Sequence, residues 1–186
     1  MRWIPAAALL LPLCAGGCGR ASRSESQAEA AAIYESLLRE HCCSDSAIVQ
    51  AVTDSAALSN PANYRAFVKD LQYFSPEIRE AVADLHTRSE SVYPLPDSVR
   101  VTGHDRRVPA DSAELMVQTL VRDDRRLYKH NPIVQLSAVG YSRDGKVAVV
   151  RIVVTCGKLC GDVTFRALRR HPGGWVAAEE VWSAVF

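Results

Sequence analysis

The spacing of apolar residues changes from helical to strand-like partway along the chain. Up to about residue 130, apolar residues recur every three or four positions, as they do along one face of a helix. Ile33, Leu37 and Leu38 follow this spacing, which predicts a helix from near Ser26 to near Cys42. The short apolar run 48–53 is suited to a strand.

Further helices are predicted from residues that favour helix starts. The three starts are Asn60-Pro61, Ser75-Pro76-Glu77, and Asp111 with Glu114 three places later. The residues expected to face the core behind them are Tyr64, Phe67, Val68 and Leu71; Ile78, Val82 and Leu85; and Leu115, Leu120, Val121 and Leu127. The last of these helices should end near Lys129, and the proline-containing segment 92–110 is expected to be irregular.

After Pro132 the apolar residues alternate with a period of two, which predicts strands. The four expected strands are 134–142, 146–156, 162–170 and 175–185. Asp144-Gly145 between the first two is a strong signal for a hairpin turn. Because 146–156 is an almost unbroken β-branched run, we expect it to be a central strand covered on both faces.

These patterns predict an α+β fold in which N-terminal helices pack on a four-stranded antiparallel C-terminal β-meander. A single domain over 30–186 is expected, with a helical part 30–130 and a β-meander 133–186. Trp175 and Trp182 lie seven positions apart on the last strand, so they should point to opposite faces of the sheet.

The N-terminus has the features of an export signal. Arg2 precedes a short apolar run, and small residues lead up to Cys18. This run is too short to span a bilayer as a helix. The segment resembles the signal of bacterial lipoproteins, which implies a signal peptide at 1–17, lipidation of Cys18, and a lipid anchor and tether at 18–29. Gly19 in place of an aspartate favours the outer membrane under that resemblance. The alternative is ordinary secretion with cleavage between Ala15 and Gly17.

Composition restricts the classes of partner. The 186-residue chain has a formal net charge of +1, and loss of Arg2 with the signal makes it neutral. A neutral balance does not favour nucleic acid, which is bound through a basic face. The expected partners are the membrane, through the lipid, and a protein or small-molecule ligand. No cofactor is expected.

Four cysteines follow Cys18, and an even number in an oxidising compartment indicates disulfides. Cys156 and Cys160 flank a strand turn, where opposed positions are close enough for a disulfide. Cys42 and Cys43 are candidates for a further disulfide, with the hairpin cysteines or with a second copy of the chain. A redox role for the cysteines is the alternative.

Other candidate chemistry has weaker support in the sequence. His41 with Cys42, Cys156 and Cys160 has donors that suit zinc, but the spacing matches no standard zinc pattern, so no metal site is predicted. His104 and Asp105 have the residue types of half of an acid–base catalytic pair. An adjacent His-Asp in a polar loop is more often simply exposed to solvent. The chain lacks the common hydrolase, metalloprotease and nucleotide-binding motifs, so no catalytic residue is predicted.

The C-terminal part resembles a group of uncharacterised exported bacterial proteins. The shared features begin at 136–142 and continue through Asp144-Gly145 to the turn Cys156-Gly157-Lys158-Leu159-Cys160-Gly161, and they end at Gly174-Trp175-Val176. The resemblance implies no particular activity. The ending of the meander is also similar to cystatin-like and nuclear-transport-factor-like cone folds, by analogy only.

Three functions are therefore considered. The preferred one is an exported, lipid-anchored protein with a non-enzymatic binding or structural role at the cell envelope. The second is an enzyme with a small pocket in a cone-like α+β fold, which requires two or more convergent titratable groups. The third is a thiol or metal protein that uses Cys42, Cys43, Cys156 and Cys160.

Overall fold

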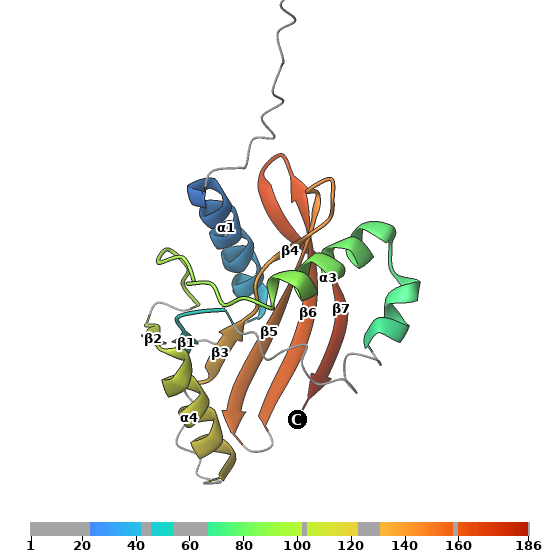
Figure 1. Ribbon diagram of the computed structural model, residues 1–186. Coiled ribbons are helices and arrows are strands. Elements are labelled where there is room, and N and C mark those ends of the chain that lie inside the picture. The colour runs from blue at the N-terminus through green and yellow to red at the C-terminus, as the bar shows by residue number, and fades with distance from the viewer. Residues whose placement is uncertain are drawn as a thin grey trace, which may run out of the picture.

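The computed structural model describes residues 23–41, 46–53, 67–101, 104–122, 131–157 and 160–185. Within them, one seven-stranded mixed sheet lies between helices on its two faces (Figure 1). The helices are α1 (Arg23–His41), α3 (Pro76–Arg88) and α4 (Ala110–Arg122), with a short 3-10 helix η2 (Leu71–Tyr73). The strands are β1 (Ile48–Gln50), β2 (Arg106–Val108), β3 (Ile133–Leu136), β4 (Gly140–Tyr141), β5 (Val147–Gly157), β6 (Cys160–His171) and β7 (Gly174–Val185).

The predicted four-stranded antiparallel meander is wrong. The strand order is β2-β1-β3-β5-β6-β7, with β4 also paired to β5. β1 runs parallel to both of its neighbours, β2 and β3, while the other pairs are antiparallel. Parallel neighbours need a long crossover connection, and the chain between β1 and β3 contains α3 and α4. The region 30–130 thus contributes strands to the sheet as well as helices.

The segment predicted as a single strand over 134–142 is divided into β3 and β4. Leu136 pairs with Ile152, whereas Gly140 pairs with Val149. The chain from β3 to β4 therefore contains one residue more than the part of β5 that it faces, which is a β-bulge. The Ser137 hydroxyl accepts a hydrogen bond from the Arg151 amide at 2.9 Å, and the Ser137 amide donates to the Arg151 carbonyl at 3.0 Å. We call residues 137–139 the bulge segment, and it turns β4 toward α3.

The two faces of β5 belong to different cores. Ala148, Val150 and Ile152 pack with α1, whereas Val147 and Val149 pack with α3. A third cluster joins α4 to β1, β2 and β3. The prediction that this strand is central and covered on both faces is confirmed.

Several local predictions can be compared with the structure. Ser75 caps α3 by accepting a hydrogen bond from the Ile78 amide, as its sequence signal predicts. Trp175 packs with the α1 side of the sheet and Trp182 with the α3 side, which confirms that they point to opposite faces.

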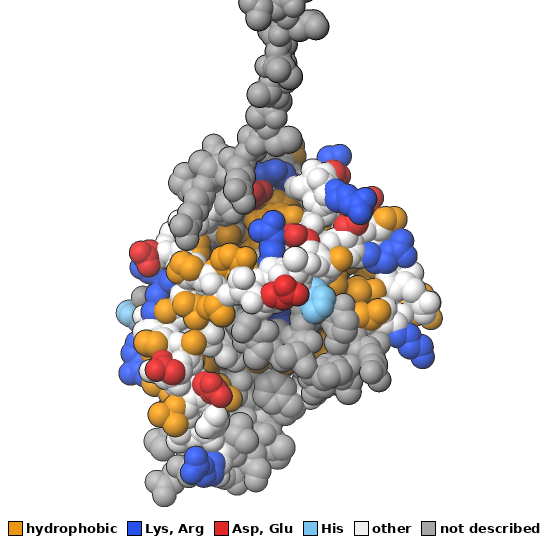
Figure 2. Space-filling model, in the orientation of Figure 1, with side chains coloured by type: hydrophobic (Ala, Val, Ile, Leu, Met, Phe, Trp, Pro, Cys, Tyr) orange, Lys and Arg blue, Asp and Glu red, His pale blue; other side chains and the backbone are white. Residues whose placement is uncertain are grey.

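The prediction that Val68 and Leu115 face the core is wrong, because these side chains are 43% and 62% exposed. Ala113 and Leu120 form the buried face of α4, and Leu115 lies on the side of the helix away from them. Figure 2 shows hydrophobic side chains at the surface over α4.

Helix α1 begins at Arg23, three positions before the expected start, so part of the proposed tether is helical. The predicted helix start at Asn60-Pro61 and the residues Val121 and Leu127 lie outside the part that the structure describes in side-chain detail. No helix among the described residues is long and apolar enough to cross a membrane.

Candidate functional site

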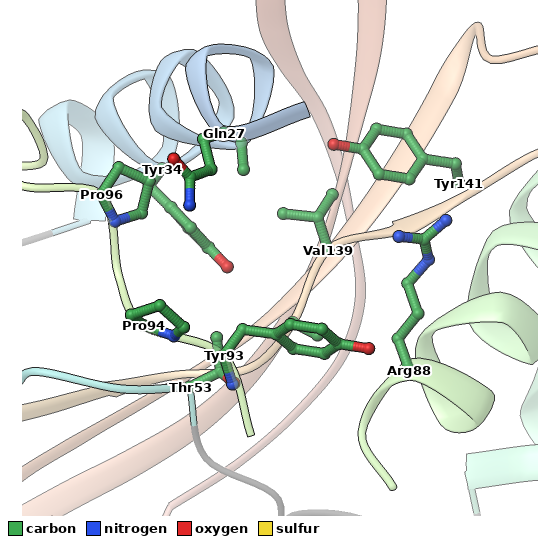
Figure 3. Close-up of a pocket in the computed structure, with 11 residues that line it drawn as sticks. Gln27, Tyr34, Thr53, Arg88, Tyr93, Pro94, Pro96, Val139 and Tyr141 are labelled. Atoms are coloured by element: carbon green, nitrogen blue, oxygen red, sulfur yellow. The ribbon is translucent and has the colours of Figure 1, made fainter. Parts of the chain in front are cut away.

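A pocket of about 200 Å³ opens between α1, the end of α3, the bulge segment with β4, and the segment 93–96 (Figure 3). Its polar lining residues are Gln27, Tyr34, Thr53, Arg88, Tyr93 and Tyr141. Its apolar lining residues are Ala30, Pro94, Pro96, Ala138 and Val139. These residues come from five separate stretches of the chain, so the pocket exists only in the folded protein.

The first wall is formed by α1. Gln27, Ala30 and Tyr34 are three and four positions apart, which places them on one face of the helix. Tyr34 is only 2% exposed, and its hydroxyl donates a 2.8 Å hydrogen bond to the Ser137 carbonyl. This bond satisfies a buried phenol and joins α1 to the bulge segment.

The second wall is the proline-containing segment 93–96. The Thr53 amide donates to the Tyr93 carbonyl at 2.7 Å, and the Tyr93 amide donates to the Thr53 hydroxyl at 2.8 Å. The guanidinium of Arg107 donates to the carbonyls of Pro96 and Val99 at 2.7 and 2.6 Å. Because the segment is held at both ends, it forms a fixed wall although it belongs to no long strand.

The third wall joins α3 to β4 through an acidic residue. Asp84 accepts a 2.6 Å charged hydrogen bond from Arg88 Nε and a 2.9 Å bond from the Tyr141 amide at the same Oδ2 atom. The Arg88 guanidinium lies 5.3 Å from the centre of the Tyr141 ring, a cation–π distance. Asp84 therefore positions both Arg88 and Tyr141 at the pocket.

The Tyr141 ring is supported from behind by an aromatic and ionic cluster. Trp175 meets it edge to face at 6.2 Å between ring centres. The Arg170 guanidinium lies 5.4 Å from the Trp175 ring and forms a 2.7 Å ion pair with Glu29 of α1. These contacts join α1, β4, β6 and β7 beside the pocket.

Two of the pocket phenols have perturbed acidity. Burial raises the pKa of Tyr34, and the nearby Tyr141 raises it further. Burial also raises the pKa of Tyr141, and the carboxylate of Glu29 adds to that shift. Both phenols are therefore uncharged hydrogen-bond donors throughout the physiological pH range.

These pKa shifts predict a loss of stability in alkali. Below the ordinary tyrosine pKa of about 10, the folded and unfolded chains both keep the phenol protons. Above it the unfolded chain releases protons that the folded chain retains, so the free energy of unfolding should fall by about 1.4 kcal/mol per pH unit for each phenol. Urea unfolding at about pH 9 and about pH 11 measures this slope. In the variant Tyr34→Phe, the fall in the free energy of unfolding per pH unit should be smaller by the contribution of one phenol. An unchanged slope in that variant would contradict the raised pKa of Tyr34.

The described lining residues determine what chemistry the pocket can perform. They include one guanidinium, three phenols, one carboxamide and one hydroxyl, and no carboxylate, imidazole or thiol. Carboxylates and imidazoles are the usual general bases of enzymes, and the described lining provides neither. The arrangement is suited to binding a ligand that carries hydrogen-bond acceptors.

The predicted disulfide is present and lies far from the pocket. Cys156 and Cys160 are bonded, with 5.1 Å between their Cα atoms, at the opposite end of β5 from the residues beside Tyr141. Bonded sulfurs are not thiolate ligands, so these two cysteines do not provide a zinc site in this state. Cys18, Cys42 and Cys43 lie outside the described residues.

Removal of this disulfide should have a modest effect. The bond closes a ring over a separation of only four positions, so the chain-entropy relation predicts a loss of about 2 kcal/mol in the double variant Cys156→Ala/Cys160→Ala. Urea unfolding without a reductant measures the loss while leaving the state of Cys42 and Cys43 unchanged. A midpoint equal to that of the parent protein would show that the bond does not stabilise the fold.

The other candidates from the sequence lie away from the pocket. Neither His104 nor Asp105 lines it, and Asp105 accepts a 2.6 Å hydrogen bond from the Val101 amide, which is a loop-shaping contact. His41 is the last residue of α1. No group of three or more potential metal-ligating side chains occurs among the residues that the structure describes.

Sequence reasoning did not identify the pocket residues. Tyr34 and Ser137 are 103 positions apart, and no short motif connects them. A weaker signal was present, because Tyr34 places a phenol on the apolar face of a helix and a buried phenol needs a polar partner. The comparisons add no further assignment: no family model matches the chain, and no curated protein or solved structure matches it either.

Proposed function

We propose that the chain is an exported, lipid-anchored protein of the bacterial cell envelope that binds a small ligand without catalysing a reaction. The observation that carries the binding role is the pocket beside Tyr34, Arg88 and Tyr141, whose walls are held in place by a buried hydrogen bond from Tyr34 and a partly buried one from Arg88. A concave site with apolar lining residues and a few directed polar groups is the usual form of a small-molecule site.

The export and anchoring part rests on the sequence. The basic start, the short apolar run and Cys18 favour a lipoprotein signal, and Gly19 in place of an aspartate favours an outer-membrane location. Arg23, where α1 begins, is five positions after Cys18, so the connecting chain spans at most about 18 Å. Because α1 forms one wall of the pocket, an anchored protein would meet its ligand close to the membrane surface.

The enzymatic alternative has less support. Its requirement was a pocket with two or more convergent titratable groups, and the described lining meets that requirement in number. The described lining includes one arginine and three tyrosines, and burial holds Tyr34 and Tyr141 in the protonated form. Such groups donate hydrogen bonds, which favours recognition over acid–base catalysis.

The anchor is tested by intact mass spectrometry of the protein purified from its host, compared with a Cys18→Ser variant. We expect a mature chain that begins at Cys18 and carries acyl groups, recovered with membranes, and we expect the variant to lack them. An unacylated mature mass would refute lipidation.

The binding role is tested by filling the pocket. Ala30 lines it, whereas Ala32 on the same helix is exposed, so Ala30→Phe and Ala32→Phe form a matched pair. Binding of single-ring fragments such as benzyl alcohol, benzamide and benzoate is followed by nuclear magnetic resonance of the protein. Binding that is lost in Ala30→Phe and kept in Ala32→Phe supports the pocket. Failure of every fragment to bind would refute the proposed function.

A further inference from the structure

The groups that line the pocket are not evenly distributed. Figure 3 shows the guanidinium of Arg88 on one side of the cavity, with the Tyr93 hydroxyl directed toward that side and the Tyr141 hydroxyl directed into the cavity. Figure 3 shows Pro94 and Pro96 across the cavity from Arg88, on the same side as Gln27 and Tyr34, and Ala30 of α1 is a further apolar lining residue. A ligand that fits both parts carries hydrogen-bond acceptors at one end and an apolar body at the other.

The charge of the described lining comes from Arg88 alone. Asp84 engages its Nε, and among the described residues no protein acceptor engages the two terminal nitrogens. Asp84 does not itself line this pocket, so it orients Arg88 without presenting a carboxylate to the ligand. A guanidinium held in this way presents a pair of parallel donors, which matches the two oxygens of a carboxylate.

The Tyr141 phenol adds a donor that stays protonated. Burial raises the pKa of Tyr141, so its hydroxyl remains a donor even beside an anion. The Tyr34 hydroxyl is already committed to the Ser137 carbonyl, which leaves Tyr93 and Tyr141 as the phenols able to donate to a ligand.

The volume of the cavity limits the size of the ligand. An engineered apolar cavity of about 150 Å³ accepts benzene, whereas sites for drug-sized ligands start at about 300 Å³. The value here is about 200 Å³. The apolar body is therefore about the size of one six-membered ring or a branched aliphatic side chain.

We propose that the pocket binds a small organic carboxylate, with the carboxylate on Arg88 and Tyr141 and a single apolar group against Ala30 and Pro94. This inference rests on the proposed function and specifies its ligand class. The same chemistry is available from a free monocarboxylic acid and from the C-terminal residue of a peptide.

The test compares probes that differ only at the acceptor group. Phenylacetate, phenylacetamide and 2-phenylethanol are titrated into the mature protein, and dissociation constants are measured by nuclear magnetic resonance. We expect phenylacetate to bind about tenfold more tightly than either neutral probe, because only it accepts two charge-assisted hydrogen bonds. Equal affinities for the three probes would overturn the carboxylate assignment while leaving the binding role intact, whereas no binding by any of them would overturn both.

Variants then assign the effect to Arg88. Arg88→Gln should reduce the preference for phenylacetate to near parity, and Arg88→Lys should retain part of it. Arg143→Gln is the matched control, because the substitution removes the same charge. The Arg143 side chain is 90% exposed and does not line the pocket. An equal loss in Arg143→Gln would show a long-range charge effect and overturn the assignment.

The two sources of the carboxylate are separated by a second set of probes. N-acetylphenylalanine, its amide, and a short peptide that ends in phenylalanine are compared with phenylacetate. Tighter binding of the peptide assigns the site to a C-terminus, and tighter binding of phenylacetate assigns it to a free acid. Equal binding of the acid and its amide would contradict the proposal.

Discussion

Replacement of Gly140 by alanine is expected to destabilise the protein by about 3 kcal/mol or more. Gly140 begins β4 and lies directly against α3, and an added Cβ would overlap the Ala81 carbonyl oxygen and the Leu85 amide nitrogen and come within 2.5 Å of the Leu85 Cβ. The first two of these are backbone atoms of a helix, which cannot rotate away as a side chain would. β4 or α3 must therefore shift.

Urea unfolding of Gly140→Ala measures the effect, and Gly173→Ala is the control. Gly173 lies in the β6–β7 turn, and an added Cβ there meets no atom within 4 Å. We expect Gly140→Ala to lower the midpoint strongly with an unchanged slope, and Gly173→Ala to leave both near the parent values. Similar midpoints for the two variants would show that α3 and β4 do not approach as closely as described.

The same shift should affect the pocket, which makes Gly140 informative about function. Asp84 accepts hydrogen bonds from Arg88 and from the Tyr141 amide, so it spans the gap between α3 and β4 that Gly140 keeps narrow. A wider gap would separate Arg88 from Tyr141. The glycine thus links the packing of the helix to the position of the proposed carboxylate-binding groups.

Strong local patterns allowed much of the antiparallel part to be predicted. The β-branched run that became β5, the Asp144-Gly145 turn and the Ser75 cap each depend on residues close together in sequence. The Cys156–Cys160 disulfide was predicted for the same reason, since a hairpin turn brings the two cysteines together. In these places local preference and tertiary packing agree.

The run 48–53 predicted a strand where β1 lies, but the parallel pairing of β1, the strand β2 and the pocket could not be predicted in this way. β1 and β2 have three residues each, which is too short to show an alternating pattern, and all three residues of β1 are buried. β2 lies within the segment 92–110, where prolines suggested irregular chain. The pocket residues Tyr34, Arg88 and Tyr141 meet only because α3 and α1 pack on opposite faces of the sheet beside the bulge segment.

Replacement of Leu37 by alanine should destabilise the protein by about 3 kcal/mol, a typical cost for deleting a buried leucine side chain. Leu37 lies on α1, has no exposed surface, and packs in the cluster that includes Val150 and Ile152 of β5. The loss combines the removal of apolar contacts with the cavity that remains. For a domain of this size it corresponds to a fall in Tm of roughly 10 °C.

Leu115→Ala is the matched control for Leu37→Ala, because it makes the same change on α4 at a side chain that is 62% exposed. Its expected cost is below about 0.5 kcal/mol, since a surface substitution leaves no cavity. Thermal and urea unfolding of both variants give the difference. Comparable losses at Leu37 and Leu115 would contradict the placement of α1 against the sheet. Because α1 also supplies Gln27, Ala30 and Tyr34, the same result would remove one wall of the proposed pocket.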